Sequence, residues 1–186
     1  MNDYNLERLN FLVVDDNTHM CTLVKGILNA LGVKNVVEAS DGADAFKELR
    51  HFSADIIIVD WNMEPLDGID FTKMVRTASD SPNPFVPIIM LTGHTEMNRV
   101  LEARDSGVHE FLAKPISVKG LYSRIRSIIE RPRPFIRSGP YFGPDRRRRD
   151  NPAYMGGERR KADTSGGEGG GGAELSQEEV EALLNG

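Results

Sequence analysis

The fold is decided by a stretch of fourteen residues, Asp55–Gly68, with the sequence DIIIVDWNMEPLDG. Four consecutive β-branched residues, 56–59, predict a strand that is buried on both faces, as in a parallel sheet covered by helices. Asp60 ends this run and would emerge at the carboxyl edge of the sheet, where open α/β folds bind their ligands. An aspartate after a strand can equally begin a turn, so its role depends on what the other strands bring to the same edge.

Strand and helix patterns alternate five times along the chain. Apolar runs predict strands at residues 9–14, 33–39, 56–59, 87–91 and 110–113. Helical spacing of apolar residues predicts helices at about 18–31, 41–49, 68–77, 96–105 and 117–130. This order indicates a doubly wound, five-stranded parallel sheet with right-handed crossovers and helices on both faces.

The formal net charge of −5 is divided unevenly. Residues 1–130 carry 13 Lys/Arg against 19 Asp/Glu, residues 131–162 carry 10 against 3, and residues 163–186 carry 0 against 6. We therefore expect an acidic domain over 1–130, an arginine-rich extension over 131–162, a glycine-rich linker over 163–174 and a helical segment over 175–186. The material after residue 130 is expected to be mostly disordered, because the globular pattern ends there.

Cysteine usage and hydropathy bear on the compartment. The single cysteine, Cys21, excludes an internal disulfide, and its place in an apolar helical pattern favours a buried, inert thiol. The N-terminus lacks the pattern of a signal peptide, and no apolar run approaches the ~18 residues of a membrane span. These features predict a cytoplasmic protein without a membrane span.

Polar side chains end four of the five predicted strands. Asp15 and Asp16 follow the first, Asp60 the third, Thr92 the fourth and Lys114 the fifth. Because the carboxyl ends of parallel strands share one edge, we expect these groups to converge. Three neighbouring carboxylates repel one another, and a hard divalent cation such as Mg²⁺ relieves that repulsion. A metal, an ammonium and a hydroxyl around a nucleophilic carboxylate suit phosphoryl transfer.

With these residues in place, residues 9–130 resemble the receiver domain of two-component response regulators, close to the single-domain chemotaxis type with a flavodoxin-like fold. The resemblance rests on the acidic pair of the first strand, on Asp60 with the following WNM and LDG sequences, on Thr92, and on Lys114-Pro115. Their separations, 32 residues from Asp60 to Thr92 and 22 more to Lys114, are typical of the family.

The resemblance implies a role for each pocket residue. Asp60 would accept a phosphoryl group from a phosphohistidine of a sensor histidine kinase. Asp16, Asp60 and the backbone carbonyl of Asn62 would hold Mg²⁺ directly, with Asp15 acting mainly through water. Lys114 would contact the phosphoryl oxygens. Beyond its own phosphorylation and dephosphorylation, the protein would not be an enzyme.

The resemblance also implies a switch. Thr92 would bond the phosphoaspartate, and Phe111, at the aromatic switch position, would follow it inward and reshape the face of the fourth helix, fifth strand and fifth helix. Phe111 lacks the hydroxyl of the tyrosine that is common in chemotaxis members. The Lys114–Pro115 bond is expected to be cis, and the loop after Asp60 departs from the family pattern because proline stands at Pro65.

The arginine-rich extension contains a short repeat, YFGPDRRR at 141–148 and YMGGERRK at 154–161. Each copy reads as an aromatic residue, a glycine turn, an acid and a basic cluster. One interpretation is a solvated tail whose arginines lie against the acidic domain. A second is an anion site, since similar extensions occur on receiver proteins that bind cyclic di-GMP; DNA or another nucleic acid is a less favoured third. The candidate anion-binding residues are Arg146, Arg147, Arg148, Arg149, Arg159 and Arg160.

The segment at 175–186, LSQEEVEALLNG, has the signals of a short amphipathic helix. Ser176 and Glu179 form a capping box. Its length is too short for a stable isolated helix, so it is expected to fold against a partner. It resembles the N-terminal peptide of the flagellar motor switch protein. It could dock on the fourth-helix/fifth-helix face of its own chain or of a neighbouring copy, or be an artificial fusion, or be an unrelated amphipathic tail. The partner-contacting residues would be Leu175, Val180, Leu183 and Leu184.

The sequence therefore predicts a response regulator that is phosphorylated on Asp60 and switches a protein-binding face, in chemotaxis or flagellar motor control. The alternative hypothesis is a cyclic di-GMP effector that binds the dinucleotide through its arginine-rich extension.

Overall fold

A computed structural model of the chain describes residues 4–93 and 105–145. Within these ranges it contains β1 (Asn10–Val14), α1 (Thr18–Ala30), β2 (Asn35–Ala39), α2 (Gly42–Glu48), β3 (Ile56–Asp60), α3 (Gly68–Thr77), β4 (Ile88–Thr92), β5 (Glu110–Ala113), α5 (Val118–Glu130), β6 (Phe135–Ser138) and β7 (Tyr141–Pro144). Most of the predicted fourth helix, at 96–104, and both C-terminal segments after Asp145 lie outside the described residues.

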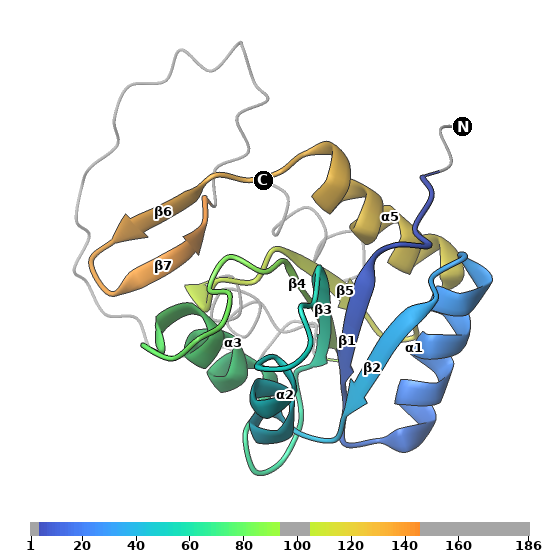
Figure 1. Ribbon diagram of the computed structural model, residues 1–186, viewed down its shortest axis with the longest axis horizontal. Coiled ribbons are helices and arrows are strands. Elements are labelled where there is room, and N and C mark those ends of the chain that lie inside the picture. The colour runs from blue at the N-terminus through green and yellow to red at the C-terminus, as the bar shows by residue number, and fades with distance from the viewer. Residues whose placement is uncertain (1–3, 94–104, 146–186) are drawn as a thin grey trace, which may run out of the picture.

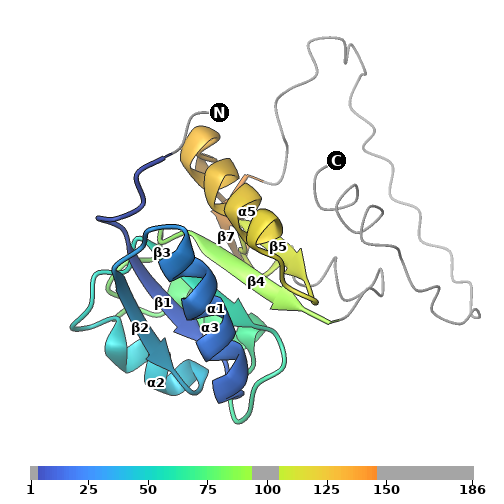
Figure 2. The same cartoon turned by 90° about the vertical axis from the view of Figure 1, so that its right-hand side faces the viewer.

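The five predicted strands form one parallel sheet. Its order is β2-β1-β3-β4-β5, with every neighbouring pair parallel. Helices α2 and α3 cover one face, while α1 and α5 cover the other (Figures 1 and 2). The doubly wound fold expected from the sequence is therefore confirmed.

Two hydrophobic clusters, one on each face of the sheet, form the core. All five residues of β3 and all five of β4 are buried, which explains their nearly continuous apolar sequences. Alternate residues of β3 belong to different clusters: Ile57 and Val59 to one, Ile56 and Ile58 to the other. This central position places the end of β3, and with it Asp60, in the middle of the sheet edge.

Polar caps begin the helices that follow the strands. The side chains of Asn17, Asp41, Asp67 and Ser117 each accept a hydrogen bond from a backbone N–H in the first turn of α1, α2, α3 and α5. Each such cap stabilises its helix by roughly 1 kcal/mol. The caps stop each helix from extending backward into the loop and so keep these loops at the carboxyl edge of the sheet. No helix in the described ranges is long and apolar enough to cross a membrane.

The structure differs from the sequence expectation after Glu130. The chain does not leave the domain there but continues into an antiparallel hairpin, β6–β7, that lies against the receiver-like core (Figure 1). The predicted glycine turn at Gly143 is wrong, because Gly143 is a buried residue within β7 and the chain reverses at Gly139, whose φ is +56°. A Cβ at position 143 would lie 2.9 Å from Gly107 Cα. Glycine is thus required for the close approach of two backbones.

Three phenylalanines hold the hairpin in place. Phe85, which precedes β4, packs edge-on against Phe135 and Phe142, with ring centroids 5.0 and 5.4 Å away. The buried guanidinium of Arg76, at the end of α3, lies 5.3 Å from the centroid of the Phe135 ring. Such aromatic and cation–π contacts each contribute roughly 0.5–1.5 kcal/mol. The hairpin is consequently part of the folded domain.

Candidate functional site

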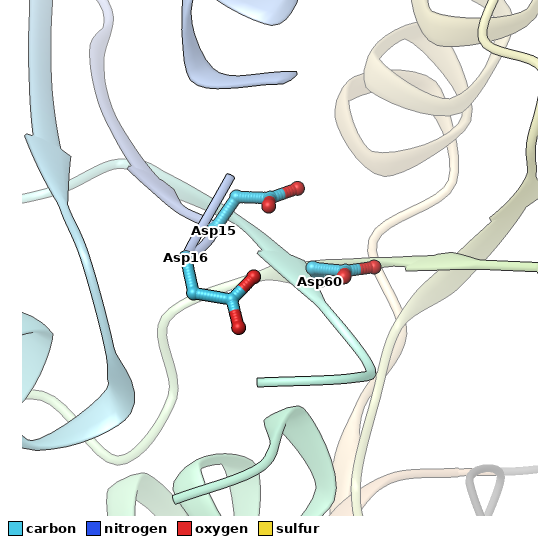
Figure 3. Close-up of side chains that lie close together, drawn as sticks. All are labelled: Asp15, Asp16 and Asp60. Carbon is cyan, nitrogen blue, oxygen red and sulfur yellow. The ribbon is translucent and has the colours of Figure 1, made fainter. Parts of the chain in front are cut away.

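Three carboxylates meet at the carboxyl edge of the sheet. Asp15 and Asp16 follow β1, Asp60 ends β3, and one carboxylate oxygen from each lies within 4.8 Å of the others (Figure 3). Asp15 and Asp60 are buried, with 2% and 6% of their surface exposed, whereas Asp16 is exposed. The sequence expectation that these residues converge is met by the geometry.

Lys114, which directly follows β5, places an ammonium group against this cluster. Lys114 Nζ lies 2.9 Å from Asp60 Oδ1 and 3.8 Å from Asp15 Oδ2. The lysine is placed there by β5, whose end is tied to β4 because Lys114 N donates to the Thr92 carbonyl at 2.8 Å. Among the described residues, one ammonium therefore faces three carboxylates, and these groups together carry an excess of negative charge.

Burial shifts the pKa of the two buried carboxyl groups, Asp60 and Asp15. Burial raises the pKa of Asp60, and the hydrogen bond and charge of Lys114 act in the opposite direction. Burial also raises the pKa of Asp15, opposed by the backbone N–H of Asn17, which donates to Asp15 Oδ1 at 2.8 Å. A cation that replaced the lost hydration would favour the charged form of both groups.

The donor set fits a hard divalent cation. Asp15 Oδ2 is buried and accepts no hydrogen bond from the described residues, so it has unused capacity as a ligand. The potential ligands are carboxylate oxygens, which Mg²⁺ prefers, and exposed Asp16 leaves a side open to water. Asp15, Asp16 and Asp60 would hold such an ion, with the carbonyl of neighbouring Asn62 as the further ligand that the family resemblance implies. Asn62 is exposed in the loop directly after β3.

Gly68 is a site residue to which the sequence analysis assigned no role. A Cβ at this position would lie 2.2 Å from the backbone oxygen of Asp60, far inside van der Waals contact. Gly68 N also donates to the Trp61 carbonyl at 2.9 Å. The loop 61–67 therefore folds back so closely that only glycine fits where α3 begins. The available signal was the LDG sequence itself, with an N-cap followed by glycine.

The two predicted switch residues are both buried. Thr92, the last residue of β4, is 1% exposed, and Phe111 in β5 is 7% exposed and packs in the cluster that contains Val59 and Met90. The structure thus places the Phe111 ring inward. The Lys114–Pro115 bond is cis as predicted, and the Glu64–Pro65 bond in the loop after Asp60 is cis as well.

Cys21 is buried as predicted, His109 is structural, and the candidates after residue 145 lie outside the described part of the chain. Cys21 is buried, and burial raises its pKa to about 11, in keeping with an inert thiol. His109 is a buried structural residue: Ile88 N donates to its Nδ1 at 3.3 Å. The arginine candidates at 146–149, 159 and 160, and the partner residues Leu175, Val180, Leu183 and Leu184, lie outside the described residues.

The chain is similar to known signalling proteins. Residues 11–126 match the family described as the response regulator receiver domain. The chemotaxis protein CheY-3 of Vibrio cholerae is 33% identical over 125 residues, which make up 67% of this chain and 95% of that protein.

Solved structures agree with this similarity. Chemotaxis protein CheY4 of Vibrio cholerae is 31% identical with a TM-score of 0.59, covering 64% of this chain and 98% of that one. The receiver domain of a sensor histidine kinase from Pseudomonas aeruginosa is 28% identical with a TM-score of 0.56, covering 64% and 94%; it was solved with a magnesium ion coordinated in its active site cleft. The family match ends at residue 126, before the hairpin β6–β7.

Proposed function

Because the chain belongs to the response regulator receiver domain family, we propose that it accepts a phosphoryl group on Asp60 from the phosphohistidine of a sensor kinase. The observation that supports this most directly is the Asp60–Lys114 pair, 2.9 Å apart, within a cluster of three carboxylates. We further propose that the protein acts in the cytoplasm as a signalling module and converts no external metabolite.

The chemistry follows from the positions of these groups. A carboxylate oxygen of Asp60 attacks the phosphorus atom, the P–N bond to the kinase imidazole breaks, and its electron pair stays on the imidazole. Lys114 neutralises part of the charge on the phosphoryl oxygens, because its ammonium already lies against Asp60 Oδ1. Mg²⁺ held by the three carboxylates would supply further neutralisation of that charge. Thr92, buried at the end of the neighbouring strand, would donate a hydrogen bond to the phosphoaspartate.

The output is a change in a protein-binding face. Phe111 lies in β5, beside the strand that ends at Thr92, and packs in the cluster with Val59 and Met90, so a shift of Thr92 toward the phosphoryl group would alter the packing next to it. Similarity to two chemotaxis proteins supports a role in chemotaxis, with the flagellar motor switch or a similar protein as the partner. The resemblance of residues 175–186 to a motor switch peptide supports the same class of partner.

The test is phosphorylation of the full chain by acetyl phosphate with Mg²⁺. We expect Asp60→Asn to abolish labelling, because the amide cannot act as the nucleophile. Asp80→Asn is the matched control, since it makes the same change at an exposed carboxylate paired with Arg50 on the surface. Labelling of the wild-type chain should also disappear when Mg²⁺ is chelated. Persistent labelling of the Asp60→Asn protein would rule the assignment out.

A second candidate function is binding of cyclic di-GMP by the arginine-rich extension. The supporting observation is that Asp145, which ends the docked hairpin and is buried, directly precedes the arginine run 146–149. The run is thereby attached to the folded domain at its first residue. Calorimetry with cyclic di-GMP should give binding that is lost when Arg146–Arg149 are replaced by alanine. Absence of binding by the intact protein would remove this candidate.

A further inference from the structure

The hairpin and the end of α5 line a partly open cavity whose lining is largely apolar. Its volume is about 180 Å³, and it lies at the amino end of β4 and β5. The ring of Phe85 is 54% exposed there, although large aromatic side chains are usually covered. An engineered apolar cavity of about 150 Å³ admits benzene, so this one can take a branched aliphatic side chain. Its lining residues are Phe85, Pro87, His109, Ile128, Pro132 and Phe135, with Glu110, Arg131 and Arg133.

A basic cleft adjoins this cavity along the outer side of α5. The cleft has a volume of about 300 Å³ and is lined by Ser123, Arg124, Arg126, Ser127, Glu130 and Arg131. Arg131 lines both the cavity and the cleft, so the two are adjacent, and we treat them together as one groove. The groove combines an apolar end with a charged one.

The charge of this groove is positive. Four arginines line it, at 124, 126, 131 and 133, against the two glutamates Glu110 and Glu130. Glu110 lies 3.8 Å from Arg124 and 3.9 Å from Arg133, and Glu130 is paired with Arg126 at 2.8 Å. Arg131 is exposed and makes no ion pair with any described residue. The groove therefore favours an acidic occupant with apolar side chains on one face.

The chain itself contains a segment of that chemistry. Residues 163–186 carry six acidic side chains and no basic ones, and four of the acids lie in 174–181 beside the apolar residues Val180, Leu183 and Leu184. Twenty-nine residues separate Asp145 from Leu175. A flexible chain of this length spans roughly 30 Å on average, about twice the radius of gyration of ~14 Å for a domain of this size. The segment can reach the groove from the end of β7.

We propose that the acidic amphipathic segment 175–186 docks in cis in this groove, which we call the α5–hairpin groove. Leu183 or Leu184 would enter the cavity beside Phe85 and Phe135, and Glu178 or Glu179 would face Arg131. Tethering raises the local concentration of the segment to the millimolar range, so a modest affinity is sufficient.

The position of the groove has a consequence for signalling. The groove lies at the amino end of β4 and β5, whereas Asp60 and Lys114 lie at the carboxyl ends of β3 and β5. Docking there does not involve the phosphorylation pocket and so needs no phosphoryl group. The groove would hold the segment in both states of the protein.

The test is a spin label on the full chain. Asn185→Cys provides the labelling position, because the native thiol of Cys21 is buried and its pKa is raised to about 11, both of which disfavour its reaction with the label at neutral pH. Amide signals are compared between the oxidised and the reduced nitroxide. We expect the largest intensity losses at residues 85–88 and 128–135, and the same pattern after addition of acetyl phosphate and Mg²⁺.

Two charge reversals on the same helix provide the matched comparison. Arg131→Glu at the groove should abolish these losses, whereas Lys119→Glu, exposed at the other end of α5, should leave them unchanged. Adding Glu179→Arg to the Arg131→Glu chain should restore them.

Three results would overturn the proposal. These are uniform weak losses, losses centred on residues 111–122, and losses seen only when labelled and isotope-enriched chains are mixed. The second would place the segment on the fourth-helix/fifth-helix face, and the third would make the occupant a second copy. Because the readout does not require phosphorylation of Asp60, it stands or fails independently of the phosphoacceptor assignment.

Discussion

The two edges of the parallel sheet both bury ionisable groups, but they treat them in opposite ways. At the carboxyl edge, Lys114 is the one cation of the described residues that faces Asp15, Asp16 and Asp60, and one buried carboxylate oxygen accepts no hydrogen bond from those residues. At the amino edge, buried Arg76 donates to the carbonyls of Gly107, Pro84 and Val86 at 2.9–3.0 Å.

This difference separates a reactive site from a structural one. The Arg76 guanidinium has the flat ring of Phe135 and three carbonyls around it, so its hydrogen-bonding groups are used in holding elements together. Burial lowers the pKa of Arg76 to about 9, and the side chain remains charged at neutral pH. At the carboxyl edge the carboxylates of the described residues outnumber the facing ammonium, and a divalent cation would compensate the excess negative charge. A buried carboxylate oxygen without a hydrogen-bond donor among the described residues therefore characterises the candidate functional edge. At the structural edge, each nitrogen of the buried guanidinium donates a hydrogen bond.

The largest effect is expected from removing the buried guanidinium of Arg76 at the amino edge of the sheet. Arg76→Met should lower the free energy of unfolding by about 4 kcal/mol, because three buried carbonyls lose a charged donor. Urea denaturation measures this change. Arg50→Met is the control, since Arg50 pairs with Asp80 on the surface and should cost about 0.5 kcal/mol. Equal losses in the two variants would contradict the structural role of Arg76.

A smaller loss is expected when the backbone of the functional edge is crowded. Gly68→Ala places a methyl group 2.2 Å from the Asp60 carbonyl oxygen, and overpacking of this kind should cost about 3 kcal/mol. Labelling of Asp60 by acetyl phosphate should fall as well, because the loop that follows it is displaced. Gly26→Ala in α1 meets nothing within 4 Å and should stabilise the protein by about 1 kcal/mol. Thermal unfolding of both variants makes the comparison, and a neutral Gly68→Ala would refute the close approach.

The smallest effect is the pH dependence that buried His109, at the amino edge, gives to the free energy of unfolding. Burial lowers the pKa of His109 to about 3, and the charges of Arg76 and Arg133 act in the same direction. Below pH 6.5 the unfolded chain therefore binds a proton that the folded chain does not, so stability falls as pH falls from 6.5 toward 3. Between pH 6.5 and pH 5 the loss from this group is about 2 kcal/mol.

Paired histidine variants test this dependence. His109→Gln should flatten the fall in stability between pH 6.5 and pH 5, while His51→Gln, at an exposed turn, should leave it unchanged. Urea denaturation at several pH values gives both curves. A His109→Gln protein with the wild-type slope would show that the histidine is not the source.

Much of the functional edge was predictable, because its polar residues lie directly after the predicted strands in the sequence. A parallel sheet brings the carboxyl ends of its strands together whatever the loops do, so Asp15, Asp60, Thr92 and Lys114 could be grouped from their positions after apolar runs. Gly68 was missed as a site residue, because its importance depends on a 2.2 Å approach to one carbonyl that only the folded loop creates.

The amino edge was far less predictable. Arg76 falls on the helical stretch 68–77 like any surface arginine, and its burial depends on a hairpin sixty residues later. The hairpin had a weak signal, two short runs at 135–136 and 141–142 around the Ser138-Gly139-Pro140 turn. Pro132 and Pro134, which follow α5, obscured this hairpin signal, because prolines there are also expected in a chain that leaves the domain.

The sequence by itself determined the parallel sheet, the grouping of carboxylates with one lysine, and the phosphoryl-transfer chemistry that such a grouping suits. These follow from periodicity and residue type, which are local properties. Tertiary structure alone decided that the domain continues to Asp145, that Gly143 lies against Gly107, and that Arg76 is saturated while Asp15 is not. Those outcomes depend on contacts between segments far apart in the chain, and no local pattern specifies such contacts.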